Sequence, residues 1–152
     1  MGMTKAEASV MIDRPTETVW SFVFSDLDRF AKTLNPDVIE SKQTSAGPIG
    51  VGTTFHETRS KTPKAIDYRM TEYEPKSMFT IAMTSGPING SRFTMRLENI
   101  EGKTRLTTGG DYHFSGFYKL LQPFMGRPGQ FRKEGEAQIG RMKRAVESEA
   151  KP

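Results

Sequence analysis

The sequence predicts an α+β fold in which a curved antiparallel sheet wraps around a long C-terminal helix. Three observations carry this prediction. Apolar residues recur at helical spacing near the N-terminus, alternate with polar residues through the middle of the chain, and return to helical spacing towards the C-terminus. The alternating segments follow one another through short turns, which is typical of an antiparallel meander. We expect residues 1–152 to form a single domain.

The N-terminal part predicts one strand and two short helices. Residues 6–13 alternate as a strand does, and Pro15 suits the first turn of the helix that follows. Ser25 or Asp26 can cap a second helix, which ends before Pro36 because a residue preceding proline is pushed out of the helical region. The two helices carry the apolar stripes Val19, Trp20, Val23 and Phe24, and then Leu27, Phe30, Ala31 and Leu34.

The middle of the chain predicts six consecutive strands, separated by turns rich in glycine, proline and other turn-forming residues. Residues 38–45 and 51–59 form the first two. The other four are marked by residues that alternate at a two-residue period, which is the pattern of a strand with one buried face. These sets are Ile66, Tyr68 and Met70; Phe79, Ile81 and Met83; Phe93, Met95 and Leu97; and Leu106, Thr108, Gly110, Tyr112 and Phe114.

A long terminal helix is predicted from the apolar stripe that begins near residue 116 and ends near residue 148. The sequence Gly-Arg-Pro-Gly at 126–129 should kink or interrupt it, since proline removes a backbone donor and glycine is a poor helix former. Gly135 lies on the stripe, which indicates the close approach of another element or space for a ligand.

Composition excludes several kinds of site. The chain has no cysteine, so it has no disulfide, no thiolate ligand and no cysteine nucleophile. Its two histidines belong to no metal-binding motif, and the glycine-rich segment 47–52 precedes a strand and lacks the spacing of a dinucleotide loop. We therefore expect neither a metal nor a cofactor.

Charge and hydropathy bear on partners and location. The net charge of +4 is spread along the chain with acidic residues between the basic ones, which argues against nucleic acid as a partner. No window approaches 18 consecutive apolar residues, so we expect no stable membrane insertion. The first residues lack the apolar core of a secretory signal, and we expect a cytoplasmic protein.

Four segments resemble those of a known superfamily. They are IDRPTETVWSFVFSDLDRF (12–30), VGTTFHE (51–57), MTEYEPKSMF (70–79) and the helical region 116–148. Their order and spacing resemble the START-like superfamily, also called Bet v 1-like or SRPBCC, and in particular its polyketide cyclase/dehydrase and lipid-transport branch. The resemblance implies a helix-grip fold with an apolar cavity between the sheet and the last helix. It also implies a hydrophobic small-molecule partner such as a lipid or polyketide.

One face of the predicted sheet collects methionine and aromatic side chains. These residues either pack as ordinary core or line a ligand cavity, and methionine suits adaptable apolar sites. The resemblance favours the cavity, with segment 114–118 and loop 86–90 as a candidate gate or a simple hinge. The candidate ligand-binding residues are Phe55, Arg59, Tyr68, Met70, Phe79, Met83, Phe93, Met95, Tyr112, Phe114, Phe117, Leu121 and Phe131.

Catalytic candidates are few. Glu57 and Arg59 share a strand face with Phe55, where they are either exposed strand charges or an inward pair. An inward Glu57 could act as a general base if burial raised its pKa, and Arg59 could recognise a carboxylate. His56 and His113 are weaker acid/base candidates, because alternation places both on the opposite face.

Three functions remain open from sequence. The first is binding, with possible transport, of a hydrophobic small molecule in an internal cavity. The second is an enzyme of the cyclase/dehydrase type that uses an acid or base in that cavity. The third is a protein-interaction module without a ligand, supported by the basic residues Arg127, Arg132, Lys133, Arg141, Lys143 and Arg144.

Overall fold

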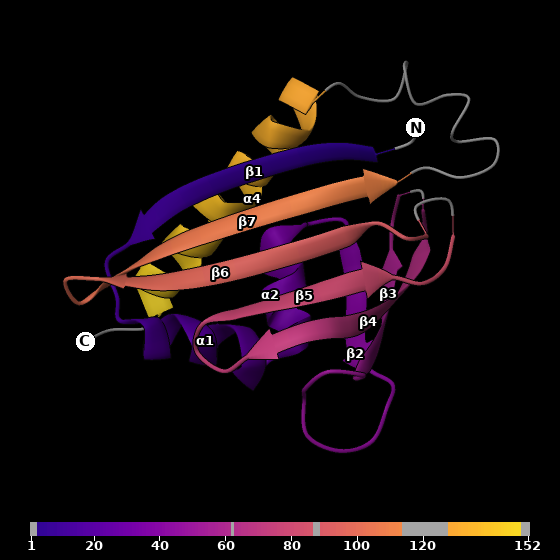
Figure 1. The fold of residues 1–152 in the computed structure, drawn as a ribbon, viewed down its shortest axis with the longest axis horizontal. Helices are drawn as coiled ribbons and strands as arrows, with labels where there is room; N and C mark the ends of the chain where they lie inside the picture. Colours follow the sequence, from indigo (N-terminus) through magenta and orange to yellow (C-terminus); the bar gives the residue numbers. More distant parts are fainter. Residues whose placement is uncertain (1–2, 62, 87–88, 114–127, 150–152) are drawn as a thin grey trace.

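A seven-stranded antiparallel sheet forms the framework of the protein (Figure 1). The computed structural model describes residues 3–61, 63–86, 89–113 and 128–149. The strands are β1 (Met3–Ile12), β2 (Val38–Gln43), β3 (Thr54–Arg59), β4 (Ala65–Glu74), β5 (Met78–Met83), β6 (Arg92–Ile100) and β7 (Lys103–His113). The described helices are α1 (Thr16–Ser25), α2 (Leu27–Leu34) and α4 (Pro128–Glu149).

The strand order is that of a meander closed by the first strand. Each of β2 to β6 pairs with the strand that follows it in sequence, and β1 pairs with β7, which gives the order β1-β7-β6-β5-β4-β3-β2. The predicted α+β architecture, with one strand, two helices, six strands and a terminal helix, is confirmed. The predicted strand bounds differ from the observed ones by a few residues at their ends.

All three described helices lie on one side of the sheet (Figure 1). α4 packs mainly against β1, while α2 packs against β2 and α4. The close approach predicted at Gly135 is present, because a Cβ at this position would lie 3.6 Å from the Cβ of Ala8 on β1. This contact places α4 directly against the first strand at Gly135.

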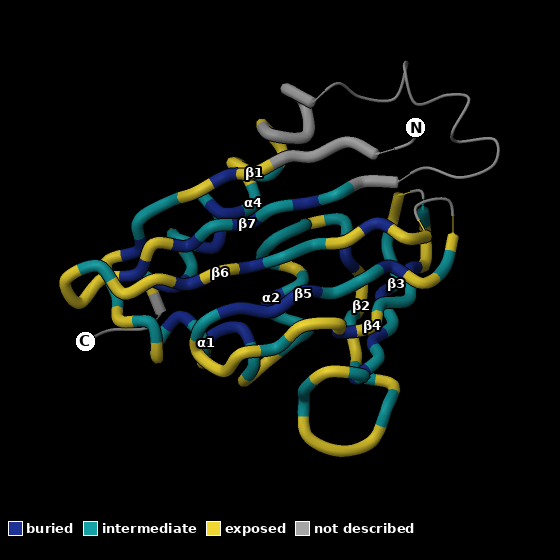
Figure 2. The backbone as a smooth tube through the Cα atoms, viewed as in Figure 1, coloured by how far each residue is buried: buried dark blue, intermediate teal, exposed yellow. Residues whose placement is uncertain are grey.

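The tightest part of the core lies between β1, β6 and β7 and the helices α1 and α4. Figure 2 shows buried backbone positions running along these elements. Alternation within the strands and helical periodicity in α1 and α4 direct these side chains to the same layer. Fully buried members are Ile12, Val19, Val23, Met95, Leu106, Met142 and Val146.

Asp26 sets the corner between α1 and α2. Its side chain accepts a hydrogen bond from the backbone N–H of Arg29 at 3.1 Å, so Asp26, and not Ser25, caps the second helix. Pro15 precedes the first helical residue of α1, as expected. The corner turns α2 across the inner face of the sheet, where it forms a wall of the cavity described below.

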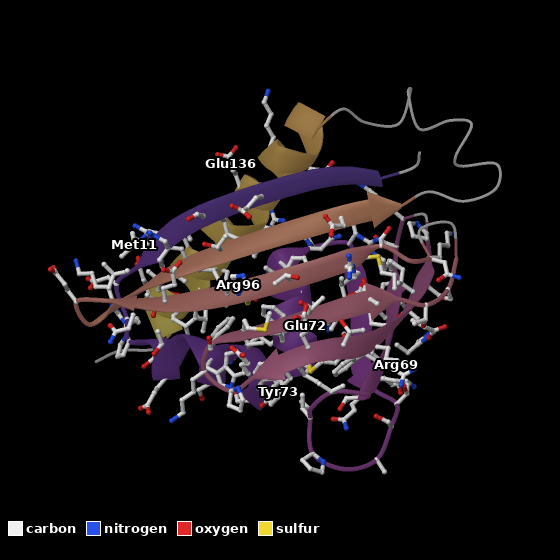
Figure 3. The ribbon with its side chains drawn as sticks, in the orientation of Figure 1. Met11, Arg69, Glu72, Tyr73, Arg96 and Glu136 are labelled. Carbon is white, nitrogen blue, oxygen red and sulfur yellow. The ribbon has the colours of Figure 1, made fainter. Side chains whose placement is uncertain are left out.

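A bulge in β4 changes which side chains face inward. The pairing of β4 with β5 shifts between Met70 and Glu72, so Tyr73 faces the helices (Figure 3). Its ring lies 5.8 Å from Trp20 and 5.9 Å from Phe24, measured between ring centroids. Strict alternation along β4 does not predict this inward tyrosine.

Candidate functional site

A cavity of about 370 Å³ lies between α2 and the inner face of strands β3 to β6. Its walls are mostly apolar. The helices contribute Val23, Leu27, Phe30, Ala31 and Leu34, and the strands contribute Phe55, Ile66, Phe79, Ile81, Met83 and Phe93. Asn35, Ser41, Pro63, Glu134 and Gln138 also line it, together with the three residues Glu57, Arg59 and Tyr68.

Phe79 belongs to the buried core and also lines the cavity. It is 3% exposed, and its ring centroid lies 6.5 Å from that of Phe30 and 6.4 Å from that of Phe93. These separations and tilted or edge-on angles are those of favourable aromatic pairs. The three rings therefore form a stable apolar wall on one side of the cavity.

The strand walls bring together six of the candidate ligand-binding residues and the catalytic candidate Glu57. Alternation on β3, β4, β5 and β6 directs these side chains to one face. The antiparallel register sets Phe55 beside Tyr68, and Tyr68 beside Met83. The six ligand candidates on the cavity wall are Phe55, Arg59, Tyr68, Phe79, Met83 and Phe93.

Met70 and Met95 point inward as predicted but do not line the cavity. They are 1% and 0% exposed and belong to the hydrophobic core. Met95 lies on β6 and belongs to the same buried cluster as Val19 and Val23 of α1. In the structure both methionines are core residues, and neither is among the described residues that line the cavity.

Several sequence candidates lie outside what the structure describes. Phe114, Phe117 and Leu121 fall outside the described residues, and so does much of the candidate gate. Tyr112 and His113 end β7, and Phe131 lies in α4. The side chains of Tyr112, His113 and Phe131 are not described, so these three candidates stay predictions.

Sequence reasoning missed the helical wall of the cavity. Leu27, Phe30 and Leu34 form an apolar stripe, and such a stripe packs against a sheet in most proteins and carries no separate signal for a cavity. Glu134 and Gln138 lie four residues apart on α4 and therefore share one helix face. Gln138 lies three residues after Gly135, on the stripe predicted for the terminal helix, whereas nothing in the sequence singles out Glu134.

Three polar side chains stand together on the cavity wall. The Tyr68 hydroxyl donates a hydrogen bond to Glu57 Oε2 at 3.0 Å. The Arg59 Nε lies 3.5 Å from the same oxygen, close enough for an ion pair. Glu57 and Arg59 come from alternate positions of β3, and Tyr68 comes from the neighbouring strand β4. The inward interpretation of Glu57 and Arg59 agrees with this geometry.

Burial raises the pKa of the Glu57 carboxyl above its ordinary value, although Arg59 and the Tyr68 hydroxyl act in the opposite direction. Glu57 is 8% exposed, so desolvation of its charged form outweighs the nearby guanidinium. A carboxyl in this state can hold or release a proton closer to neutral pH than an exposed glutamate does.

His56 lies on the outer face of β3, away from the cavity. Its Nδ1 is 2.6 Å from Asp67 Oδ1, and this contact is the main cause of the lowered pKa of the Asp67 carboxyl. The histidine is therefore a surface partner of Asp67 and does not reach the polar cluster. Within the described residues, no group of three His, Asp or Glu side chains could hold a metal ion.

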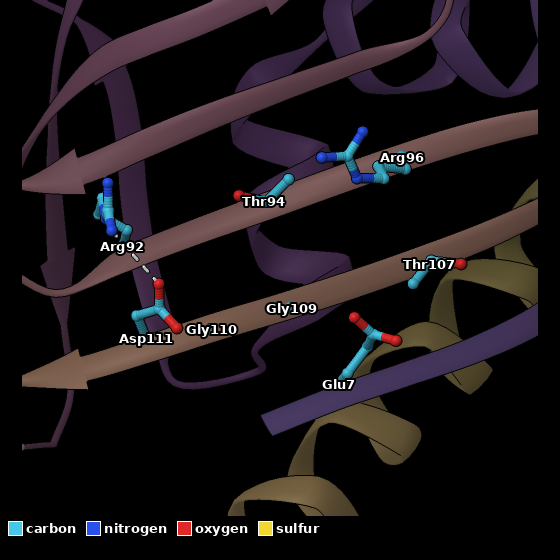
Figure 4. A pocket seen from close by; sticks show the side chains of 8 residues that line it. All are labelled: Glu7, Arg92, Thr94, Arg96, Thr107, Gly109, Gly110 and Asp111. Carbon is cyan, nitrogen blue, oxygen red and sulfur yellow. Dashed lines mark hydrogen bonds and ion pairs between the residues drawn. The ribbon is translucent and has the colours of Figure 1, made fainter. Parts of the chain in front are cut away.

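A second hollow, of about 410 Å³, lies on the outer face of the sheet (Figure 4). Gly109 leaves it open, since this residue has no side chain and pairs with Thr94 on one side and Glu7 on the other. The rim carries both signs of charge, including an ion pair of 3.5 Å between Arg92 and Asp111. The lining of this outer hollow lacks large apolar side chains, so we take the inner cavity between α2 and the sheet as the candidate site.

None of the described helices is both long enough and apolar enough to cross a membrane. The described part of the chain therefore contains no candidate membrane-spanning helix.

Comparison with solved structures shows the same fold. The protein TTHA0849 of Thermus thermophilus has a TM-score of 0.72 and 15% identity, covering 97% of this chain and 99% of that one. Ara h 8.0201 has a TM-score of 0.65 and 16% identity, with 97% and 99% coverage. Norcoclaurine synthase from Thalictrum flavum, solved with dopamine and hydroxybenzaldehyde, has a TM-score of 0.67 and 15% identity, with 99% and 90% coverage.

No match is found among curated protein sequences. The sequence does match one family profile, described as polyketide cyclase/dehydrase and lipid transport, over residues 3–147. This match covers nearly the whole chain and agrees with the Bet v 1-like fold of the solved structures. The chain belongs to the polyketide cyclase/dehydrase and lipid transport family of the SRPBCC superfamily.

Proposed function

We propose that this protein binds a hydrophobic small molecule, such as a lipid or polyketide, in the cavity between α2 and the sheet. The apolar cavity of about 370 Å³ is the observation that carries the proposal. Pockets for small molecules commonly have volumes of about 300–1,000 Å³, with apolar walls and a few placed polar groups. The description of the family, which includes lipid transport, supports the same function.

Native mass spectrometry after exposure to a lipid extract tests this proposal. We expect the wild-type protein to retain apolar molecules through desalting. Ala31→Phe places a ring at a position that lines the cavity, so this variant should retain less. Ala82→Phe is the matched control, because Ala82 lies on β5 between the inward residues Ile81 and Met83 and faces the other side of the sheet. Failure of the wild type to retain any apolar molecule, or equal retention by both variants, would contradict the proposal.

Acid/base catalysis is a second candidate function, and the state of Glu57 favours it. This carboxyl has a raised pKa, lies on the cavity wall and accepts a hydrogen bond from Tyr68. Such a group can take a proton from a carbon acid next to a carbonyl, while the neighbouring Arg59 guanidinium polarises the carbonyl. A polyketide-like substrate would then be cyclised or dehydrated.

Glu57→Gln separates catalysis from binding. We expect this variant to bind a poly-β-ketone as the wild type does but no longer to convert it. Conversion is measured by chromatography of the products. Unchanged conversion would remove Glu57 from the chemistry. Tyr68→Phe should reduce conversion less, because it leaves the carboxyl in place.

Two of the basic residues that support an interaction module instead hold α4 in position. Arg141 donates hydrogen bonds to the backbone carbonyls of Thr33 and Leu34, and Lys143 donates to the carbonyl of Met11 at 2.6 Å. These contacts leave less of the basic surface for a partner, and we favour the ligand-binding function. We propose a cytoplasmic location on the absence of cysteine, which suits a reducing compartment.

A further inference from the structure

The polar cluster in the cavity is incompletely satisfied. Arg59 Nε is buried and makes no hydrogen bond among the described residues, because its 3.5 Å contact with Glu57 Oε2 lacks hydrogen-bond geometry. Tyr68 and Arg59 both contact Oε2 of the carboxylate. Within the described residues, these contacts leave Glu57 Oε1 open to a donor. The cluster therefore offers one donor and one acceptor to a molecule in the cavity.

The charged side chains on the cavity wall restrict which polar group a bound molecule can carry. The charged residues lining the cavity are Glu57, Arg59 and Glu134, so two carboxylates face one guanidinium. A ligand carboxylate would add a third negative charge beside Glu57 in a poorly solvated site. A ligand ammonium would meet Arg59, which already has Glu57 as its counter-charge. A pure hydrocarbon would leave the Arg59 donor without a partner.

An uncharged hydroxyl group fits these conditions, because it can both donate and accept a hydrogen bond. We propose that Glu57, Arg59 and Tyr68 select a hydrophobic molecule bearing an uncharged hydroxyl, such as a phenol or an alcohol. The hydroxyl donates to Glu57 Oε1 and accepts from the Arg59 guanidinium, while Tyr68 holds the carboxylate in place through Oε2. This inference rests on the proposed ligand-binding function and names the chemical class of the ligand.

A series of naphthalenes that differ in one substituent tests the inference. The probes are 2-naphthol, 2-naphthoate, 2-naphthylmethylammonium and 2-methylnaphthalene, with dissociation constants measured by equilibrium dialysis at neutral pH. We expect 2-naphthol to bind more tightly than the two charged probes. Arg59→Met should weaken 2-naphthol by about tenfold or more, as expected for a lost hydrogen bond to a charged group, and leave 2-methylnaphthalene within about twofold.

Two further variants keep the test interpretable. Arg59→Met leaves Glu57 buried without its counter-charge, so the double variant Arg59→Met/Glu57→Gln is measured as well. It should lose the same preference without an unpaired charge at position 57. Arg69→Met is the matched control, since Arg69 is exposed on the outer face of β4. It should bind all four probes as the wild type does.

The outcomes separate this inference from the proposed function. Tightest binding of 2-naphthoate or of 2-naphthylmethylammonium overturns the inference and leaves the cavity a ligand site. An equal loss of 2-naphthol and 2-methylnaphthalene in the Arg59 variants also overturns it, because the substituent then does not contact the cluster. If no probe binds, and Ala31→Phe behaves as the wild type, the proposed function fails together with the inference.

Discussion

Met95 offers the sharpest test of how side chains are divided between core and cavity. It is 0% exposed on β6, whereas the next inward residue towards the cavity, Phe93, lines the cavity wall. Replacing a buried methionine by alanine removes its packing and leaves a void, which costs about 2–5 kcal/mol. For a chain of this size each kcal/mol lowers the melting temperature by roughly 2–4 °C. Met95→Ala should therefore lower the melting temperature by roughly 4–20 °C.

The measurement is thermal and urea unfolding followed by circular dichroism, with Arg96→Ala as the control. Arg96 is the next residue along β6 and is exposed on the outer face (Figure 3), so its replacement should change stability by less than about 0.5 kcal/mol. At a temperature where both variants are folded, their affinity for 2-naphthol should match that of the wild type. Equal costs at the two positions, or a larger cost at Arg96, would refute the register of β6, because a slip of one residue exchanges the two faces.

Three further predictions concern a helix cap, a close contact and a titrating group. Asp26→Ala should destabilise the protein by about 1 kcal/mol in urea unfolding, because it removes the cap of α2. Ser25→Ala should cost less, and a larger loss of stability for Ser25→Ala than for Asp26→Ala would contradict the cap assignment. Gly135→Ala should be tolerated, since its Cβ would lie at an ordinary contact distance, 3.6 Å, from the Cβ of Ala8. Gly135→Leu should lower the melting temperature, because the longer side chain pushes α4 away from β1. Equal melting temperatures of the two variants would contradict that packing. The folded protein binds the Glu57 proton more tightly than the unfolded chain does, so this group's contribution to stability falls as pH rises from about 4.3 through the raised pKa. The free energy of unfolding of Glu57→Gln minus that of the wild type should therefore be larger at neutral pH than at about pH 4. A difference that stays constant, or that is smaller at neutral pH, would refute the burial of a charged carboxylate.

Most of the framework was predictable from local patterns. Alternation of Phe93, Met95 and Leu97 identifies β6 because every second side chain of a strand faces the same layer. Antiparallel order follows from the short turns, as in Glu101-Gly102, where both residues have positive φ, at 53° and 86°, and join β6 to β7 tightly. The inward direction of Glu57 and Arg59 follows from the same alternation once Phe55 is placed inside.

The cavity itself was less predictable, for two physical reasons. Periodicity tells which face of a strand is covered, but not whether a helix side chain or open space covers it, so Met95 and Met83 look alike in sequence and differ in the structure. A β-bulge also leaves only a weak signal in the sequence, as with the bulge between Met70 and Glu72 that turns Tyr73 inward. Distances such as the 3.0 Å hydrogen bond from Tyr68 to Glu57 depend on register between strands and require coordinates.

The central claim is that a hydrophobic molecule occupies the space beside Met83. The most direct measurement is NMR on protein labelled with ¹³C at the methionine methyl groups and saturated with 2-naphthol. Met83 is the described methionine that lines the cavity, whereas Met70 and Met95 are buried in the core. We predict nuclear Overhauser contacts from the naphthol ring to the Met83 methyl and none to those of Met70 or Met95. Contacts confined to Met11 on the outer face of β1 (Figure 3), or no contacts at saturation, would contradict the claim.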